Sequence, residues 1–237
     1  MPTYNNDGTL RDVVEHTLQF CPDVIVVNDG CTDTSAEILA SFGENIIVVD
    51  YGKNRGKGYA LKQGFRKAKE LGFDYAITID SDGQHFPEDI PLFISALEQH
   101  PNALIVGSRN LNEENMPGKN TFANKFSNFW FKIQTGVNLP DTQTGYRLYP
   151  LKKLLNLRFL TSRYEAELEL LVGAAWRGTD LIPIKINVFY PKAEERVSHF
   201  HPFWDFLRIS VLNTFLCFLA VVYGLPSRFI RRRRHHD

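Results

Sequence analysis

Short runs of consecutive apolar residues alternate along the chain with stretches in which apolar residues recur every three or four positions. The runs occupy residues 24–27, 46–49, 75–79 and 103–106, and such continuous runs predict strands buried on both faces. Helical spacing is seen at residues 10–18, 56–69 and 88–98, and Thr34 to Glu37 match a capping box that would open another helix. This alternation predicts an α/β fold with a mainly parallel central sheet flanked by helices.

The second half is less regular. It contains a predicted aromatic-rich helix around Phe126 and Trp130, a polar loop at 141–147, a periodic helix at 164–176 and a strand at 181–190. Residues 1–8 are expected to form a loop.

Polar side chains follow three of the predicted strands, at the point where each strand ends. These segments are Asn28-Asp29-Gly30, Asp80-Ser81-Asp82 and Gly107-Ser108-Arg109. In open α/β sheets, ligands bind beyond the carboxyl ends of the strands. The three segments therefore predict a binding site at this edge of the sheet.

Asp80 and Asp82 form a pair of carboxylates that directly follows a strand. On a continuing strand, residues two apart point to the same side, so both carboxylates would face one space. Two anions that close raise each other's pKa unless a cation lies between them. With the amide of Gln84 they offer hard oxygen ligands suited to Mg²⁺ or Mn²⁺. The alternative is an acidic turn, for which Asp and Gly are also suited.

Composition and charge narrow the class of protein. The 237 residues are 43% apolar and 23% charged, as in a globular protein, and the formal net charge of +0 gives no argument for nucleic acid binding. The three cysteines (Cys21, Cys31 and Cys217) have no paired or metal-ligand spacing, which favours a reducing, cytosolic setting. A polar N-terminus gives no sign of a signal peptide.

The C-terminal segment is apolar and then basic. Residues 209–227 carry no charge, Arg208 and Arg228 flank them, and Arg231 to Arg234 follow. A spanning helix, an interfacial helix and a helix packed on its own domain are all compatible with this length. Phe203, Trp204 and the arginines favour a membrane surface.

Six segments, at residues 2–6, 27–33, 54–58, 80–85, 107–109 and 141–147, resemble in sequence and order those of the inverting family 2 glycosyltransferases with a GT-A fold. Within that family the chain resembles most the transferases that use dolichyl or undecaprenyl phosphate. The resemblance covers roughly residues 1–200. It implies a GT-A domain at 1–200, followed at 201–237 by a membrane-associating helix and basic tail.

The resemblance also implies a set of site residues. Contacts to the nucleotide-sugar would come from Pro2, Tyr4, Asn5, Asn6, Asp29, Gly56, Lys57, Asp80 and Ser81. Asp80, Asp82 and Gln84 would hold Mg²⁺ or Mn²⁺, and the catalytic group would be Asp82, Arg109, Arg147 and Asp141. Both arginines would clamp phosphate, because a guanidinium can bind it with two parallel hydrogen bonds. The competing interpretations are a helix cap for Asp29, a solvated basic turn at 55–58 and surface ion pairs for the arginines. A structural role is preferred for His199.

The implied function is metal-dependent, inverting transfer of a sugar from a nucleotide-sugar (GDP-mannose or a UDP-sugar) to a polyprenyl phosphate at the cytosolic membrane face. A lipid phosphate needs no general base, because it is already ionised at pH 7. A glycan hydroxyl would need one, with Asp141 and Glu165 as the candidates. The alternatives are a transferase that extends a surface polysaccharide or glycolipid, and an inactive membrane-bound partner protein.

The family normally opens with an apolar strand before the segment at 2–6, and in this sequence Met1 directly precedes Pro2. The expectation is that the natural protein begins upstream, with an apolar strand of about five residues. Without it, a sheet would keep unpaired backbone groups and a slot in its core.

Overall fold

The structure is a computed structural model that describes residues 1–109, 118–154, 161–189, 202–224 and 226–227, without the side chains of 118–122 and 202–206. Two β-sheets form its centre. The first has the order β1–β2–β3 and contains β1 (Pro2–Thr3), β2 (Ile25–Asn28) and β3 (Ile47–Asp50), all parallel. The second has the order β4–β6–β5–β7 and contains β4 (Tyr75–Thr78), β6 (Arg147–Pro150), β5 (Leu104–Ser108) and β7 (Leu181–Lys185). The predicted α/β class is confirmed.

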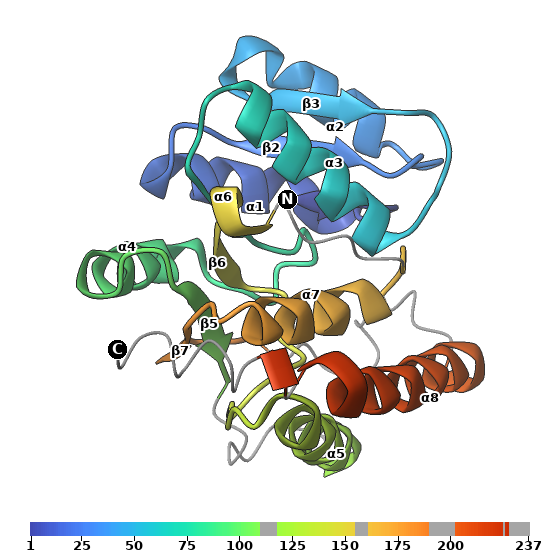
Figure 1. Ribbon diagram of the computed structural model, residues 1–237. Helices are drawn as coiled ribbons and strands as arrows, with labels where there is room; N and C mark the ends of the chain where they lie inside the picture. The colour runs from blue at the N-terminus through green and yellow to red at the C-terminus, as the bar shows by residue number, and fades with distance from the viewer. Residues whose placement is uncertain (110–117, 155–160, 190–201, 225, 228–237) are drawn as a thin grey trace.

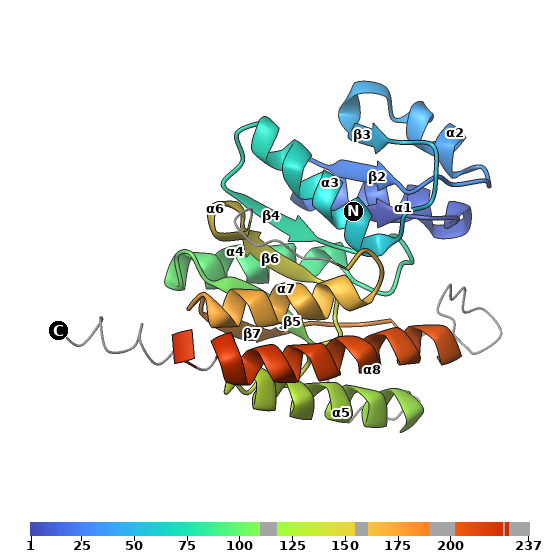
Figure 2. The same ribbon diagram turned by 45° about the vertical axis from the view of Figure 1, so that its right-hand side comes forward.

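Helices cover both sheets (Figures 1 and 2). Around the first sheet lie α1 (Asp7–Phe20), α2 (Ser35–Ser41) and α3 (Lys57–Glu70). The second sheet lies between α4 (Ile90–Gln99) and α7 (Glu165–Trp176), and α8 (Pro202–Leu219) lies beside α5 (Gly118–Thr135) at the bottom of both views. The shorter helices are η1 (Gly43–Asn45), η2 (Pro87–Asp89), α6 (Leu151–Leu154) and the π-helical turn η4 (Ala220–Gly224).

The largest core cluster joins α3, α7 and α8 to the second sheet. Phe65 of α3, Tyr149 of β6 and Leu171 of α7 are fully or almost fully buried in it. Helix α7 is buried on nearly all sides, including its first turn, where Glu165 and Glu167 lie inside the protein. Packing of α7 therefore brings two carboxylates into the interior near the start of α3.

The beginning of the chain differs from the expected loop. Pro2 and Thr3 form β1, and the Met1 amino group donates a hydrogen bond to the Ile25 carbonyl (2.8 Å). β1 and β4 are edge strands of the two sheets, and an apolar cavity of about 340 Å³ lies between them. Its lining includes Met1, Ile25 and Ile77. The expected slot in the core is therefore present beside a very short first strand.

Three local features differ from the sequence analysis. Strand β3 is at a sheet edge rather than buried, and its Val48 is 41% exposed. The capping box at Thr34 does not form: its hydroxyl donates to Asp7, and Asp33 Oδ1 accepts the Ser35 N–H (3.0 Å) instead. Strand β6 was not expected, because a four-residue strand that begins with arginine has no apolar pattern.

Helix α8 packs on its own domain through one face. Leu212, Leu216 and Ala220 belong to the core, and α8 contacts α5 and α7. The opposite face is apolar and exposed at Leu207, Val211, Phe215, Phe218 and Val222. Within the described chain, one helical segment, Leu207–Gly224, is long and apolar enough to cross a membrane, and 28% of it is buried. His199 and the arginine-rich tail lie outside the described residues.

Candidate functional site

Asp80 lies just beyond β4 and pairs with Lys57, the first residue of α3. Lys57 Nζ is 2.8 Å from Asp80 Oδ1 and 3.2 Å from Glu167 Oε2. Gly145 closes over this group, since a Cβ there would lie 2.8 Å from both Asp80 Oδ2 and Lys57 Nζ. Burial alone would raise the pKa of Asp80, but the charge of Lys57 holds it below the usual value. Asp80 is therefore an ionised carboxylate neutralised by a protein cation.

Asp82 lies in a turn rather than on a continuing strand. Gly83 has a φ of 73°, and the Gln84 N–H donates to Asp82 Oδ1 (3.0 Å). Burial and the charge of Asp80 raise the pKa of Asp82 to about 6. The expected carboxylate pair is present. It is formed by a turn, however, and the explanation from strand alternation was wrong.

Ser81 ties the start of the chain to this acidic turn. Its hydroxyl accepts a hydrogen bond from Asn6 Nδ2 (2.8 Å) and donates one to the Pro2 carbonyl (3.2 Å), and its carbonyl accepts the Thr9 hydroxyl (2.7 Å). Ser81 is only 1% exposed. These bonds give Ser81, Pro2 and Asn6 a role in positioning the acidic turn, and their contact to a nucleotide stays a prediction.

The loop at Tyr4 and Asn5 packs against the segment that follows β2. Asn5 has a φ of 51°, and its side-chain oxygen accepts the Thr32 N–H (2.8 Å). Its own N–H donates to Cys31 Sγ (3.2 Å). Both Tyr4 and Asn5 are half-buried, so they border the site without being sealed inside it.

Asp29 organises the loop before α3. Its Oδ1 accepts the Tyr51 hydroxyl (2.6 Å) and the Arg55 N–H (2.7 Å), and its Oδ2 accepts the Gly56 N–H (2.8 Å). The competing interpretation, a cap of the helix that follows Asp29 in sequence, is wrong: Asp29 instead holds the loop at the start of α3. The predicted contact to a nucleotide base is untested by this arrangement.

Gly56 is required by packing between elements. Its φ is 92°, and a Cβ would lie 2.7 Å from the Ser162 carbonyl. A Cβ on Gly58 would likewise overlap Ala166 of α7. The glycines let α3 approach α7 closely, whereas the sequence had suggested close approach to a ligand.

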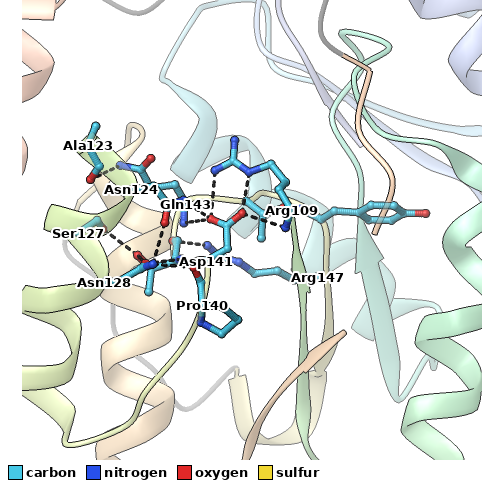
Figure 3. Close-up of polar contacts among 12 residues, drawn as sticks. Arg109, Ala123, Asn124, Ser127, Asn128, Pro140, Asp141, Gln143 and Arg147 are labelled. Atoms are coloured by element: carbon cyan, nitrogen blue, oxygen red, sulfur yellow. Dashed lines mark hydrogen bonds and ion pairs between the residues drawn. The ribbon is translucent and has the colours of Figure 1, made fainter. Parts of the chain in front are cut away.

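Arg109 and Asp141 form a bidentate ion pair (Figure 3). Arg109 donates through Nε to Oδ2 (2.6 Å) and through Nη2 to Oδ1 (3.0 Å) of Asp141. Asn124 Nδ2 (2.6 Å) and the Gln143 N–H (3.0 Å) also donate to Oδ1. Burial would raise the pKa of Asp141, but Arg109 and these donors hold it below the usual value. Asp141 is an ionised structural centre, which argues against its use as a general base.

Arg147 lies inside the protein and not at the mouth of the site. Its exposed fraction is 0%, and its guanidinium donates to the Thr142 carbonyl (3.0 Å) and the Glu167 carbonyl (2.9 Å). It thereby joins the 141–147 loop to α7. This placement favours a positioning role over the phosphate clamp that the sequence suggested.

Replacing Arg147 by lysine is therefore expected to destabilise the fold. A single ammonium cannot reach both carbonyls, and each buried hydrogen bond to a charged donor contributes about 1.5–3 kcal/mol. We expect a loss of roughly 2 kcal/mol in the free energy of unfolding measured by urea denaturation. Arg66→Lys, at a side chain that is 71% exposed, is the matched control and should change it by less than about 0.5 kcal/mol. Equal stability of both variants would contradict this role.

Two residues of the site region were missed in the sequence. Glu167 contacts Lys57, yet in sequence it is one of several acids in an apolar helix. His85 is buried, and burial lowers its pKa to about 4 despite the opposing charge of Asp80. The charges of Lys57, Arg109 and Asp141 also act on His85, which indicates that these groups share one region. The clue to Glu167 is the rarity of two acids in the first turn of a buried helix.

The oxygen ligands present fit a hard divalent cation. Asp80, Asp82 and Gln84 provide two carboxylates and an amide, and the raised pKa of Asp82 shows a carboxylate that a cation would stabilise. Among the described residues, His, Cys, Asp and Glu side chains form no group of three that could hold a metal. The two carboxylates and the amide of Asp80, Asp82 and Gln84 suit Mg²⁺ or Mn²⁺, because these ions keep bound waters and take further ligands from phosphate.

The sequence matches the family model "Glycosyl transferase family 2" over residues 1–155. This chain belongs to glycosyl transferase family 2. It is therefore a glycosyltransferase, and the resemblance noted in its motifs is confirmed. The acidic pair at the end of β4 lies within the matched region.

Named relatives act on lipid phosphates. The family 2 chain is 29% identical over 211 residues to UDP-N-acetylglucosamine–dolichyl-phosphate N-acetylglucosaminyltransferase of Methanococcus voltae, covering 80% of this chain and 84% of the relative. It is 28% identical over 203 residues to undecaprenyl-phosphate mannosyltransferase of Micrococcus luteus, covering 79% and 81%.

Among solved structures, the fold is similar to glucosyl-3-phosphoglycerate synthase of Mycobacterium tuberculosis in complex with Mn²⁺, UDP and glucosyl-3-phosphoglycerate. The TM-score is 0.65 at 18% identity, covering 92% of this chain and 77% of that one. At this identity the likeness establishes the shared GT-A fold. The metal and UDP belong to that protein.

Proposed function

We propose that this glycosyltransferase moves a sugar, with inversion, from a nucleoside-diphosphate sugar to a polyprenyl phosphate at the cytosolic face of a membrane. The relatives named for dolichyl and undecaprenyl phosphate support this acceptor. The observation that carries the proposal is the state of Asp141. Its carboxylate is fully buried and engaged by Arg109, Asn124 and Gln143, so it is a poor proton acceptor. A phosphate acceptor needs none.

On the donor side, Asp80, Asp82 and Gln84 would hold Mg²⁺ or Mn²⁺. When bound, the cation neutralises charge that develops on the leaving diphosphate. The protein contributes the framework: Ser81 fixes the acidic turn to the first loop, and Asp29 fixes the loop that presents Lys57 at the start of α3. Tyr4 and Asn5 border the same edge and are proposed to contact the nucleotide.

Arg109 is proposed to supply positive charge on the acceptor side of the site. It is not proposed to bind phosphate through two uncommitted guanidinium nitrogens. Its Nε and one terminal nitrogen are committed to Asp141. The pair is held by the 141–147 loop, which Arg147 ties to α7. The position of the Arg109 charge therefore depends on this loop keeping its shape.

Membrane association is proposed to use the outward face of α8. Val211, Phe215, Phe218 and Val222 follow one another at helical spacing and are exposed. The basic residues that follow in sequence, Arg228 and Arg231 to Arg234, would favour an anionic lipid surface. The core contacts of the opposite face favour a helix that lies on the membrane with its domain attached.

An acceptor screen tests the proposal. Purified protein would receive UDP- and GDP-sugars with Mn²⁺, and either undecaprenyl phosphate in detergent micelles or soluble oligosaccharides. Transfer to the lipid phosphate, at a rate at least about a hundredfold above transfer to any hydroxyl, is the expected result. Faster transfer to oligosaccharide would instead establish the polysaccharide-extending alternative, and no turnover with any donor would favour an inactive partner protein.

A further inference from the structure

Lys57 occupies an unusual position for a lysine in an acidic site. Its ammonium lies 2.8 Å from Asp80 Oδ1 and 3.2 Å from Glu167 Oε2, and its side chain is only 18% exposed. Three elements converge to make this contact: the start of α3, the end of β4 and the first turn of α7. A buried ammonium is costly unless it is paired, and here two carboxylates share it.

Glu167 is only partly satisfied by this arrangement. Its Oε2 contacts Lys57, whereas its Oε1 is buried and has no hydrogen-bond partner within the described structure. A Cβ on Gly145 would lie 3.0 Å from this oxygen, so the side chain is held in a close-packed space. Glu167 can therefore accept a second hydrogen bond from an ammonium without moving far.

The charges around Asp80 affect how tightly a divalent cation can bind there. Asp80, Asp82 and Glu167 are three carboxylates, and Lys57 is the cation that contacts two of them. A divalent ion that binds Asp80 meets repulsion from the ammonium already there, because like charges at about 3–4 Å repel strongly in a partly buried site.

We propose that Lys57 is the counter-ion of Asp80 in the metal-free site, and that Glu167 is the carboxylate that keeps Lys57 when a divalent cation takes its place on Asp80. This inference rests on the proposed metal site at Asp80 and Asp82. Lys57 and Glu167 act as positioning residues: they set how tightly the metal binds without ligating it. Exchange of cations keeps Asp80 neutralised throughout, and Lys57 stays paired.

The test measures Mn²⁺ affinity directly, from the electron paramagnetic resonance signal of free Mn²⁺ titrated with the full-length protein and no nucleotide. Lys57→Met removes the competing cation and is expected to tighten Mn²⁺ binding by at least about tenfold. Glu167→Gln leaves Lys57 with Asp80 alone and is expected to weaken binding by about tenfold. Glu165→Gln is the matched control, because it makes the same change two residues earlier in the first turn of α7. Its Mn²⁺ affinity should stay within about twofold of the wild type.

A double variant distinguishes an effect of Glu167 that acts through Lys57 from a direct effect of the Glu167 charge on Mn²⁺ affinity. If Glu167 acts by holding Lys57, then Glu167→Gln should change Mn²⁺ affinity by less than about threefold once Lys57 is methionine. Additive effects in the double variant, or an unchanged affinity in either single variant, would overturn the inference. Each variant's thermal melting is recorded, so that an effect of misfolding is seen as such.

The metal site itself is checked in the same titration. Asp82→Asn is expected to abolish Mn²⁺ binding in both the wild-type and the Lys57→Met backgrounds. If Asp82→Asn bound Mn²⁺ as tightly as the wild type, the proposed metal site would be wrong and this inference would fail with it. If Asp82→Asn lost the metal while Lys57→Met and Glu167→Gln behaved as the wild type, only the role of Lys57 and Glu167 would fail.

Discussion

Asp82→Asn is expected to abolish sugar transfer while making the metal-free protein more stable. Loss of one of two carboxylate ligands removes most of the charge stabilisation of the leaving diphosphate, which corresponds to several kcal/mol and a rate loss of about 10³-fold. The transfer rate is measured at saturating nucleotide-sugar and Mn²⁺.

The stability change has the opposite direction. Burial and Asp80 raise the pKa of Asp82 from 3.8 to about 6, so its charged form is disfavoured by folding. For an acid with a raised pKa, this cost is absent below about pH 4 and grows as pH rises through 6. Asparagine removes the cost, and because Asp82 is partly exposed we expect a gain of about 1–2 kcal/mol at pH 7.

Asp12→Asn on the exposed face of α1 is the control, with no change in either measurement expected. A variant at Asp82 that kept its transfer rate in limiting Mn²⁺ would show that this carboxylate does not hold the metal. A variant that lost both activity and stability would show a structural role instead.

Adding an apolar segment before Met1 is expected to raise the melting temperature by about 5 °C or more. The cavity of about 340 Å³ lies between β1 and β4, the edge strands of the two sheets. A parallel strand of about five residues there would pair with backbone on both sides and bury apolar side chains, each contributing about 1.5–3 kcal/mol against the cost of ordering the segment.

The pH dependence of stability reports whether any segment is joined to Met1. Burial lowers the pKa of the Met1 amino group from 8.0 to about 6. Between pH 8 and pH 6 the unfolded chain binds a proton at this amine more readily than the folded chain does. The free energy of unfolding therefore decreases as pH falls from 8 to 6. Conversion of this amine to a peptide bond removes the group, and the loss over that range should disappear.

The matched control is an extension of equal length made of glycine and serine. It also removes the buried amino group, but it offers no apolar side chains to the cavity. It should flatten the pH dependence without the rise in melting temperature at pH 8. If the apolar and the polar extensions gave the same melting temperature, the cavity would not be a strand site.

The fold and the position of the site could be read from the sequence because continuous apolar runs end in polar residues. Asp29, Asp80 and Arg109 all lie at strand ends, as expected. The side-chain contacts within the site could not be predicted from the sequence. Lys57 meets Glu167 because α3 and α7 pack closely at Gly56 and Gly58, although the two residues are more than 100 positions apart in the sequence.

One other failure has a physical reason of the same kind. Arg147 looks like a site residue in sequence because arginines are rarely buried, and only the packing of β6 against α7 shows its carbonyl partners. The aromatic-rich helix expected around Phe126 and Trp130 is present as α5, and Phe126 and Phe129 lie on its exposed side. Periodicity indicates that a face exists, but not which surface covers it.

The most direct test of the central claim is detection of the lipid product. Purified protein is incubated with a nucleotide-sugar, Mn²⁺ and undecaprenyl phosphate, and the products are identified by mass spectrometry. We expect a glycosyl phosphate lipid and free nucleoside diphosphate in equal amounts, with neither formed after chelation of the metal or by Asp82→Asn. Nucleoside diphosphate release without any glycosylated lipid, or lipid product formed equally well in the presence of chelator, would contradict the account.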